Sequence, residues 1–301
     1  LGMFLGLIFM SKKFRTLGDN SKILTVPSWI GEKYKSKTIK IFFGIISLLQ
    51  ITFMVLIVVG VTIVLSTTLN ASIPLILFLL LAFTIAYISI GGASIHIVTN
   101  SFQGIIMLIT AILLLISGPL FANLNISEIF NKLYEIDPNL VSITNPKSLL
   151  FRDIFEVFIA NFLVGVAIIC QPHLISKALY LRSERDVNKY LTTAIIVGTI
   201  FFMVLFTGIY ARGLLTGEVL PPDQSMAAYI NHIFPPPLIA FVNLGILAAG
   251  FSTLEGLFIA LSTIFSVDIL KTTLSNRTKF ADEEKLNSFI LKVTRIFIVI
   301  L

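Results

Sequence analysis

The chain has 301 residues, of which 56% are hydrophobic and only 13% charged, and its mean hydropathy is +0.97. Soluble domains are about a quarter charged, so this composition excludes a water-soluble globular enzyme and indicates a polytopic, all-α membrane protein. The net charge of +6 does not by itself indicate nucleic-acid binding, because in a membrane protein the informative quantity is how Lys and Arg are distributed among the loops.

Six apolar runs are long enough to cross a bilayer, since a spanning helix needs roughly 20 residues. Run length predicts spans at 39–68, 73–92, 96–119, 154–180, 190–213 and 237–268. Residues 1–10 and 288–301 are apolar but shorter, and we interpret them as partial spans. The sequence therefore predicts one transmembrane domain over 1–301, truncated at both ends, with six complete spans and two partial ones.

The first connection, residues 11–40, carries eight basic side chains against Asp19 and Glu32. Basic loops stay in the cytoplasm. Because each span carries the chain to the other side of the membrane, loops 181–189 and 271–287 then fall on the same side as 11–40. The loops assigned to this side, with their flanking residues, hold 18 of the 22 basic side chains. We therefore expect an integral protein of the plasma membrane with these three loops in the cytoplasm.

Two longer connections, 120–153 and 214–236, are expected on the outside. Each contains a stretch with helical spacing, from Ile126 to Tyr134 in the first and from Gln224 to Ile233 in the second. Prolines flank the second stretch. Two interpretations of it stay open: an ordinary short loop helix, or a helix that lies along the membrane surface or caps the external mouth.

The span 154–180 is interrupted by Gly165 and Pro172. A proline inside a helix removes one hydrogen bond and leaves carbonyls of the preceding turn free for a ligand. The polar residues Asn161 and Gln171 lie near this interruption. Either the span is a kinked helix without a ligand, or residues 161–172 depart from a regular helix and line a solute path.

The last complete span contains hydroxyl side chains and one carboxylate in an apolar run. At about 100° per residue, one face of a helix collects the small and polar residues Gly245, Ala249, Ser252, Gly256, Thr263 and Ser266. Such a face either packs closely against another helix or lines a cavity. Glu255 lies on its shoulder, and an intramembrane carboxylate costs about 2.5 kcal/mol or more unless it is paired or hydrated. Glu255 therefore has either a functional role or a place in a structural ion pair.

Four stretches resemble, in the right order, signatures of the sodium:solute symporter family. They are Leu24-Thr25-Val26-Pro27-Ser28-Trp29, then Ile90-Gly91-Gly92 with Thr99, Asn100 and Gln103, then Gln171-Pro172-His173, and finally Ala248 to Leu254 followed by Ser262 to Ile269. The third is similar to the broken sixth core helix of proline-type and pantothenate-type members. The fourth is similar to the eighth core helix. Together the stretches cover nearly the whole chain.

The resemblance implies a five-plus-five inverted-repeat fold that works by alternating access and couples inward sodium movement to solute uptake. By the family's pattern, this chain begins near the end of the second core helix and stops in the ninth. The implied partners are Na⁺, a small organic solute and the lipid bilayer, with no nucleic acid and no organic cofactor. Neither the sequence nor the resemblance indicates an oligomeric state.

The resemblance also implies site residues. In the family, one carbonyl and two hydroxyls of the eighth core helix hold a sodium ion, and the matching positions are Ala249 for the carbonyl and Ser252 and Thr253 for the hydroxyls. Solute contacts are expected on the broken span. The residues concerned are Asn161, Val164, Gly165, Ile168 and Gln171.

Several positions depart from the family pattern. Asn100 stands where many members have Asp, and Val164 and Ile168 stand where proline-type members carry aromatic side chains, which leaves the ion's exit route and the solute open. Glu255 lies about one turn, roughly 5 Å, from Ser252 along the helix axis. We place Asn100 and Glu255 on the ion path. For Glu255 the alternatives are a neutral hydrogen-bond donor and a tether to a Lys, an Arg or a helix N-terminus.

Two functions from different classes fit this sequence. One is a sodium-coupled symporter, and the other is a sensor module of a membrane signalling protein that keeps the symporter fold. No nucleophile, base and orienting residue recur at a recognisable spacing, so an enzyme is not expected. Asp268 and His173 are expected at helix ends.

Overall fold

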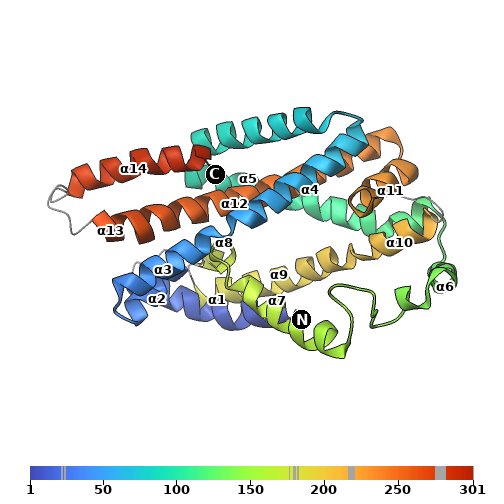
Figure 1. Ribbon diagram of the computed structural model, residues 1–301, viewed down its shortest axis with the longest axis horizontal. Helices are drawn as coiled ribbons and strands as arrows, with labels where there is room; N and C mark the ends of the chain where they lie inside the picture. Colours follow the sequence, from blue (N-terminus) through green and yellow to red (C-terminus); the bar gives the residue numbers. More distant parts are fainter. Residues whose placement is uncertain are drawn as a thin grey trace.

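A computed structural model describes the whole chain except residues 22, 24, 176, 179–180, 182, 216–220, 275–282 and 301. Within its helices, the side chains of 17–21, 88–98, 222, 283, 295 and 298–300 are also outside the description. Leu24, the side chains of Ile90 to Gly92 and residues 275–282 of the predicted loop 271–287 therefore lie outside the described residues. The long helices lie roughly along one axis and form an elongated bundle (Figure 1).

The described part of the chain is all-helical. Its α-helices are α1 (Gly2–Ser21), α2 (Val26–Lys33), α3 (Lys37–Leu48), α4 (Ile51–Leu69), α5 (Ile73–Phe121), α6 (Ile126–Ile136), α7 (Asn161–Ile169), α8 (Pro172–Ile175), α9 (Glu184–Met203), α10 (Phe206–Leu214), α11 (Ser225–Ile233), α12 (Pro236–Thr263), α13 (Thr272–Leu274) and α14 (Glu283–Ile300). Two π-helical segments, η2 (Phe155–Ala160) and η5 (Ile264–Lys271), adjoin α7 and α12. Short 3-10 turns occur at Pro138–Leu140 and Pro222–Gln224.

Four helical stretches among the described residues are long and apolar enough to cross a membrane. They are Lys37–Leu69, Thr99–Phe121, Glu184–Leu214 and Pro236–Leu274. These overlap the spans predicted at 39–68, 96–119, 190–213 and 237–268. Two shorter apolar helices, Ile73–Tyr87 and Phe155–Ile169, fall in the remaining two predicted spans. The chain is thus a polytopic, all-α membrane protein, as the composition predicts.

The span predicted over 154–180 is interrupted next to Pro172, as the sequence predicts. The chain forms η2 and then the regular helix α7, breaks at Cys170 and Gln171, and resumes as the four-residue helix α8. Pro172 is the first residue of α8, where its missing N–H would have no helical partner in any case. The irregular part is therefore shorter than the predicted range 161–172.

Gly165 does not break α7, because it serves packing instead. A Cβ atom on Gly165 would lie 2.9 Å from the backbone nitrogen of Met3, and one on Gly6 would lie 3.2 Å from the carbonyl oxygen of Val166. The absence of side chains at these positions allows α1 and α7 to pack backbone against backbone. This close approach is the small-residue packing typical of membrane helices.

The two spans predicted at 73–92 and 96–119 are the two arms of one helix, α5, which stays helical between them. On a straight helix Phe83 and Gln103 would lie about 30 Å apart. Yet Phe83 packs on Phe251 with ring centroids 4.9 Å apart, and Gln103 bonds to Glu255, only one turn further along α12. The two arms of α5 therefore fold back beside α12 (Figure 1). Helical hydrogen bonding through the bend keeps backbone groups satisfied where water is absent.

The helices form two groups. In Figure 1, α4, α5, α12 and α14 lie in the upper half, and α1, α7 and α9 lie below them. The core of the first group joins α4, α5 and α12 through Met54, Val61, Leu65, Ile76, Leu80, Leu254, Leu257, Phe258 and Leu261. The core of the second joins α1 to the ends of α7, α8 and α9 through Leu7, Phe14, Ile169, Ile175, Val187 and Leu191.

The two predicted helical stretches in the longer connections form as α6 and α11. Helix α11 is packed rather than free, since Tyr229 and Ile230 are fully buried. The Tyr229 hydroxyl bonds to Ser117 near the end of α5 at 2.6 Å, and Ile230 packs on Val242 at the start of α12. Burial raises the pKa of Tyr229 above its usual value of 10.0. Helix α11 thus covers the end of the bundle where α4, α5 and α12 meet.

Candidate ion and solute site

The hydroxyls of α12 are the first part of the site. Thr253 Oγ1 donates a hydrogen bond of 2.9 Å to the carbonyl oxygen of Ala249, one turn earlier. A threonine in a helix makes this bond because its hydroxyl reaches the carbonyl four residues back. The bond uses the only proton of the hydroxyl, so the Thr253 oxygen keeps lone pairs, whereas the Ala249 carbonyl also accepts the helical N–H of Thr253. The two groups therefore place two oxygens at one point on α12, and the hydroxyl oxygen is the one with lone pairs open to a cation.

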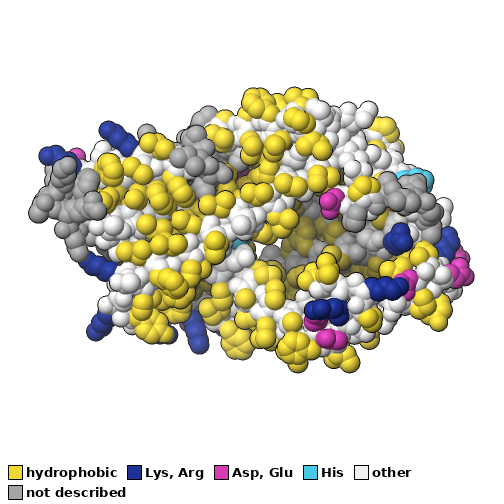
Figure 2. Space-filling view, in the orientation of Figure 1, with side chains coloured by type: hydrophobic (Ala, Val, Ile, Leu, Met, Phe, Trp, Pro, Cys, Tyr) yellow, Lys and Arg dark blue, Asp and Glu magenta, His cyan; other side chains and the backbone are white. Residues whose placement is uncertain are grey.

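These two oxygens lie beside a cavity of about 480 Å³ between α4, α5, α11 and α12, which is within the usual size range of ligand pockets. Its lining residues are Ile57, Gly60, Val61, Val64, Leu114, Met226, Ile246, Ala249, Gly250 and Thr253. Among them Thr253 has the only hydroxyl, so the wall is apolar except at this point. Figure 2 shows the molecule hollowed near the middle of this face, below α4.

Ser252, the third predicted sodium ligand, points to a different neighbour. Its hydroxyl donates to Asn100 Oδ1 at 2.5 Å, on the second arm of α5. It is not among the residues that line the cavity. The structure therefore brings Ala249 and Thr253 together at the cavity. Ser252, which precedes Thr253 in the helix, is instead bonded to Asn100 of α5.

Glu255 is the next polar residue of α12 after Ser252 and Thr253, in the direction of η5. The side chain is only 2% exposed, and Gln103 Nε2 donates to its Oε1 at 3.3 Å. Tyr87, at the end of the first arm of α5, lies beside both Glu255 and Thr99. The carboxylate thus lies where both arms of α5 meet α12. The carbonyl, hydroxyl and carboxylate oxygens of α12, together with the Asn100 amide oxygen of α5, are the ligand types that a hard cation prefers.

The predicted solute residues lie on another element. Val164 and Ile168 on α7 are 55% and 37% exposed, and Gln171 is half-buried at the break before α8. Gly165 is in contact with α1. None of these residues, nor Asn161, is among those lining the cavity beside α12. The structure therefore separates the predicted solute residues from the predicted ion ligands.

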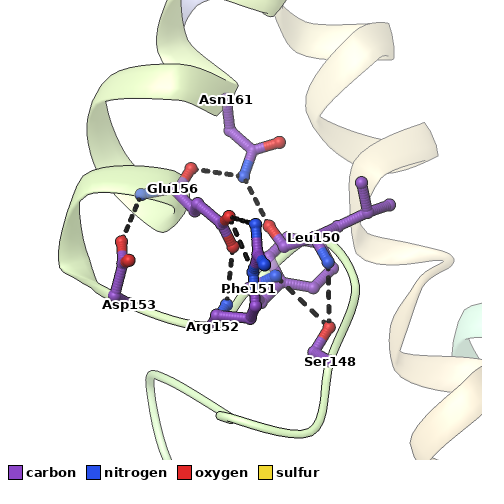
Figure 3. A network of polar contacts seen from close by, with 7 residues as sticks. All are labelled: Ser148, Leu150, Phe151, Arg152, Asp153, Glu156 and Asn161. Atoms are coloured by element: carbon purple, nitrogen blue, oxygen red, sulfur yellow. Dashed lines mark hydrogen bonds and ion pairs between the residues drawn. The ribbon is translucent and has the colours of Figure 1, made fainter.

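Asn161 belongs to a local network at the start of the broken span (Figure 3). Its amide nitrogen donates to the carbonyl oxygens of Glu156, at 2.7 Å, and Leu150, at 3.5 Å. The Glu156 carboxylate pairs with Arg152. In Figure 3 the amide oxygen of Asn161 points away from these partners. This oxygen is the part of Asn161 that can still contact a solute.

Two polar contacts were not found from the sequence. Buried Asn243 on α12 accepts a hydrogen bond of 2.9 Å from Thr68 on α4. Asp268, expected at a helix end, lies fully buried inside η5, where Ser28 and Lys40 contact it. Asn243 could have been noticed in the sequence, because it is a single amide side chain in an apolar run. No local signal identifies the partners of Asp268, because they lie more than 220 residues away in the sequence.

An all-helical membrane fold with oxygen-rich positions along one central helix is the architecture of a membrane carrier. Comparison with known proteins specifies the class. The model of the sodium:solute symporter family matches residues 1–301, and the chain belongs to that family. The family consists of transporters, not enzymes.

Three relatives show where the chain stands within it. It is 28% identical over 296 residues to the sodium/pantothenate symporter of Haemophilus influenzae, covering 95% of this chain and 58% of the relative. It is 27% identical to the sodium/pantothenate symporter of Escherichia coli over 73% of this chain and 44% of the relative. It is 23% identical to the high-affinity proline transporter PutP of Bacillus subtilis, over 90% of this chain and 58% of the relative. The chain spans about half the length of these curated relatives.

Proposed function

We propose that the chain forms part of a sodium-coupled symporter that takes up a small organic solute by alternating access. Family membership over the whole chain supports this proposal. So do relatives named as sodium/pantothenate symporters and as a proline transporter. From their basic side chains, we propose that loops 11–40, 181–189 and 271–287 lie on the cytoplasmic side of the plasma membrane.

One observation carries the ion site. The Ala249 carbonyl and the Thr253 hydroxyl meet at the only hydroxyl-bearing point of an otherwise apolar cavity wall. We propose that sodium binds at these oxygens, with Ser252 as a third ligand. Asn100 and Glu255 then lie along the ion's path. Binding couples to transport if the ion stabilises the outward-open state, because a ligand shifts a conformational equilibrium by its difference in affinity for the two states.

The solute is proposed to contact the broken span, at Asn161, Val164, Gly165, Ile168 and Gln171. The solutes in the names of the relatives, pantothenate and proline, are both carboxylates. Exposed aliphatic and amide groups on α7 suit a solute that combines an apolar skeleton with hydrogen-bonding groups. We therefore propose a small organic carboxylate as the solute class.

The test is uptake by the full-length protein in proteoliposomes. Pantothenate, proline, other amino acids, sugars and short carboxylates are each supplied with an inward sodium gradient, with a potassium gradient as the control. We expect at least one carboxylate to accumulate only with sodium. Uptake that is indifferent to sodium, or absent for every solute, contradicts the proposal.

A further inference from the structure

His173 is a buried polar side chain to which the proposed function gives no role. It is the second residue of α8, directly after the break in the broken span, and it is 6% exposed. Its ring stacks on Phe53 of α4, with the ring centroids 6.2 Å apart and 28° between the ring planes. Nδ1 of the imidazole is buried and has no hydrogen-bond partner in the described part of the chain. Since buried polar atoms are nearly always hydrogen-bonded, this nitrogen is available to a ligand.

The stacking on Phe53 places the imidazole next to the face of α4 that lines the cavity. At about 100° per residue, Phe53 shares one face of α4 with Ile57, Val61 and Val64. The last three residues line the cavity beside α12. Phe53 lies one turn before Ile57, about 6 Å along the helix axis. His173 therefore lies about one turn beyond the cavity lining of α4.

Gln50 extends the same face of α4 by one further turn. It is the N-cap of α4 and has right-handed helical backbone angles. It precedes Phe53 by three residues, so the two side chains are neighbours on the helix surface. Gln50 Oε1 is buried and, among the described residues, has no hydrogen-bond partner. The face of α4 thus leads from an apolar cavity to a polar end, where an amide oxygen and a ring nitrogen both lack partners.

Lys177 adds a positive charge beside His173. It follows His173 by four residues, and its ammonium group is close enough to act electrostatically on the imidazole. The side chain is half-buried. Within the described part of the chain, no carboxylate pairs with it. A half-buried cation without a counter-ion attracts an anionic ligand.

Helix α8 connects the broken segment to the helices around the cavity. It packs on α12 of the first group and on α1 of the second, and it lies between the two groups in Figure 1. The other proposed solute residues are not part of the cavity wall, so α8 is the part of the broken segment that reaches the cavity helices. A purely structural role for His173 explains its stacking on Phe53. It does not explain a cation and two unpartnered polar atoms next to each other.

We propose that His173 and Lys177 bind the carboxylate of the solute, and that Gln50 accepts a hydrogen bond from a donor group elsewhere on the solute. The apolar skeleton of the solute then lies along Phe53, toward the cavity. The inference rests on the proposed uptake of a small organic carboxylate. It adds to that proposal the groups that recognise the charge, and it requires a solute with a carboxylate and at least one hydrogen-bond donor.

The first test detects an anion site without knowledge of the solute. Gln50→Cys is made in full-length protein whose native cysteines, including Cys170, are replaced by Ser. It is modified with an anionic and with a cationic methanethiosulfonate, sulfonatoethyl and trimethylammonioethyl, and each rate is divided by the rate of the same reagent with 2-mercaptoethanol. Lys177→Met removes the charge. Lys189→Met is the matched control, because Lys189 is an exposed lysine of α9.

We expect the anionic reagent to be favoured in the background and in Lys189→Met. Lys177→Met should slow the anionic reagent and accelerate the cationic one, each by about fivefold, the effect of one charge at roughly 8 Å in an effective dielectric constant of about 40. Equal rates in Lys177→Met and Lys189→Met overturn the anion site. So does a lack of reaction with both reagents, since a solute site must admit a charged group.

The second test measures the role of the imidazole in transport. His173→Phe keeps a flat ring on Phe53 and removes Nδ1, and His232→Phe, at an exposed position of α11, is the control. With pantothenate and proline as probes, we expect about a tenfold higher KM in His173→Phe, the factor for one hydrogen bond to a charged group. The sodium concentration for half-maximal uptake and the melting temperature should match those of His232→Phe. An equal KM in the two variants overturns the role of His173.

The two tests separate this inference from the proposed function. If neither probe is taken up with sodium but Lys177→Met changes the reagent preference at position 50, the anion site stands and the proposed uptake of these carboxylates fails. If uptake depends on sodium while neither Lys177→Met nor His173→Phe differs from its control, the proposed function stands and the carboxylate site fails.

Discussion

Helix α12 with η5, and the broken segment formed by η2, α7 and α8, differ in how they are held. In the apolar stretch of Pro236–Leu274, 56% of the residues are buried, against 17% in Lys37–Leu69. Polar groups of α12 reach other helices, as Ser252 does to Asn100 and Glu255 to Gln103. In the broken segment, Val164 is half-exposed, and Asn161 bonds to backbone within eleven residues of itself.

The difference suits different roles for the two regions: ion binding on α12 and solute contacts on the broken segment. A regular, buried helix fixes the positions of its side-chain oxygens through the contacts of its neighbours, which suits an ion site that needs defined geometry. A segment that is broken between α7 and α8 and has exposed side chains can adapt its shape, which suits contacts to an organic solute. Each prediction below tests whether one region behaves as a fixed support and the other as an adaptable surface.

The largest expected effect is on the support of α12. A Cβ atom on Gly245 would lie 2.6 Å from Thr110 Cβ on α5, whereas one on Gly256, on the same helix, would meet nothing within 4 Å. Gly245→Ala should destabilise the protein by about 1–3 kcal/mol, as overpacking does, and Gly256→Ala should not. Thermal unfolding in detergent measures both variants. Equal melting temperatures would show that α12 and α5 are not tightly packed here.

A smaller effect is expected at Glu255. Glu255→Gln keeps an acceptor for Gln103 and removes the charge. The sodium concentration for half-maximal uptake should rise about fivefold, the effect of one charge at roughly 8 Å in an effective dielectric constant of about 40. Glu135→Gln, at an exposed position of α6, is the control. Normal sodium dependence in Glu255→Gln would give this carboxylate a purely structural role.

The broken segment should affect the solute and not the ion. Ile168→Ala shortens a side chain of the proposed solute face, and we expect about a threefold higher KM for the transported solute, less than the usual effect of buried apolar contacts because the side chain is partly exposed. Sodium dependence at saturating solute should stay constant. Leu163→Ala, at a more exposed position off that face, is the control. A shift in sodium dependence with constant KM would reverse the assigned roles of the two regions.

The smallest effect concerns the connection that leads into η2. Hydrogen bonds from Lys147 and then Asn139 lower the pKa of Asp137 from 3.8 to about 2. Because the folded pKa is depressed, the stabilisation of this loop is complete above 3.8 and is lost as the pH falls toward 2. Carboxyl NMR should show the Asp137 midpoint near 2 and a return toward 3.8 in Lys147→Met, with Lys132→Met unchanged. The same midpoint in both variants would show that Lys147 does not bind Asp137.

The sequence predicted best what depends on one helix alone. Helical periodicity placed Ala249 one turn from Thr253, and run length located α4, α9 and α12. It failed where distant segments decide the structure. The buried contact of Asp268 is with Ser28, 240 residues away. Gly165 was interpreted as a break because its packing against α1 leaves no local signal.

The most direct test of the account is equilibrium binding of radioactive sodium to the purified full-length protein, because it needs no knowledge of the solute. Thr253→Ala removes the hydroxyl at the cavity wall. Thr263→Ala removes a hydroxyl with the same bond on the same helix, to the Ile259 carbonyl at 2.7 Å. The account predicts at least a roughly tenfold loss of sodium affinity in Thr253→Ala and none in Thr263→Ala. Equal affinity in the two variants would contradict the sodium site.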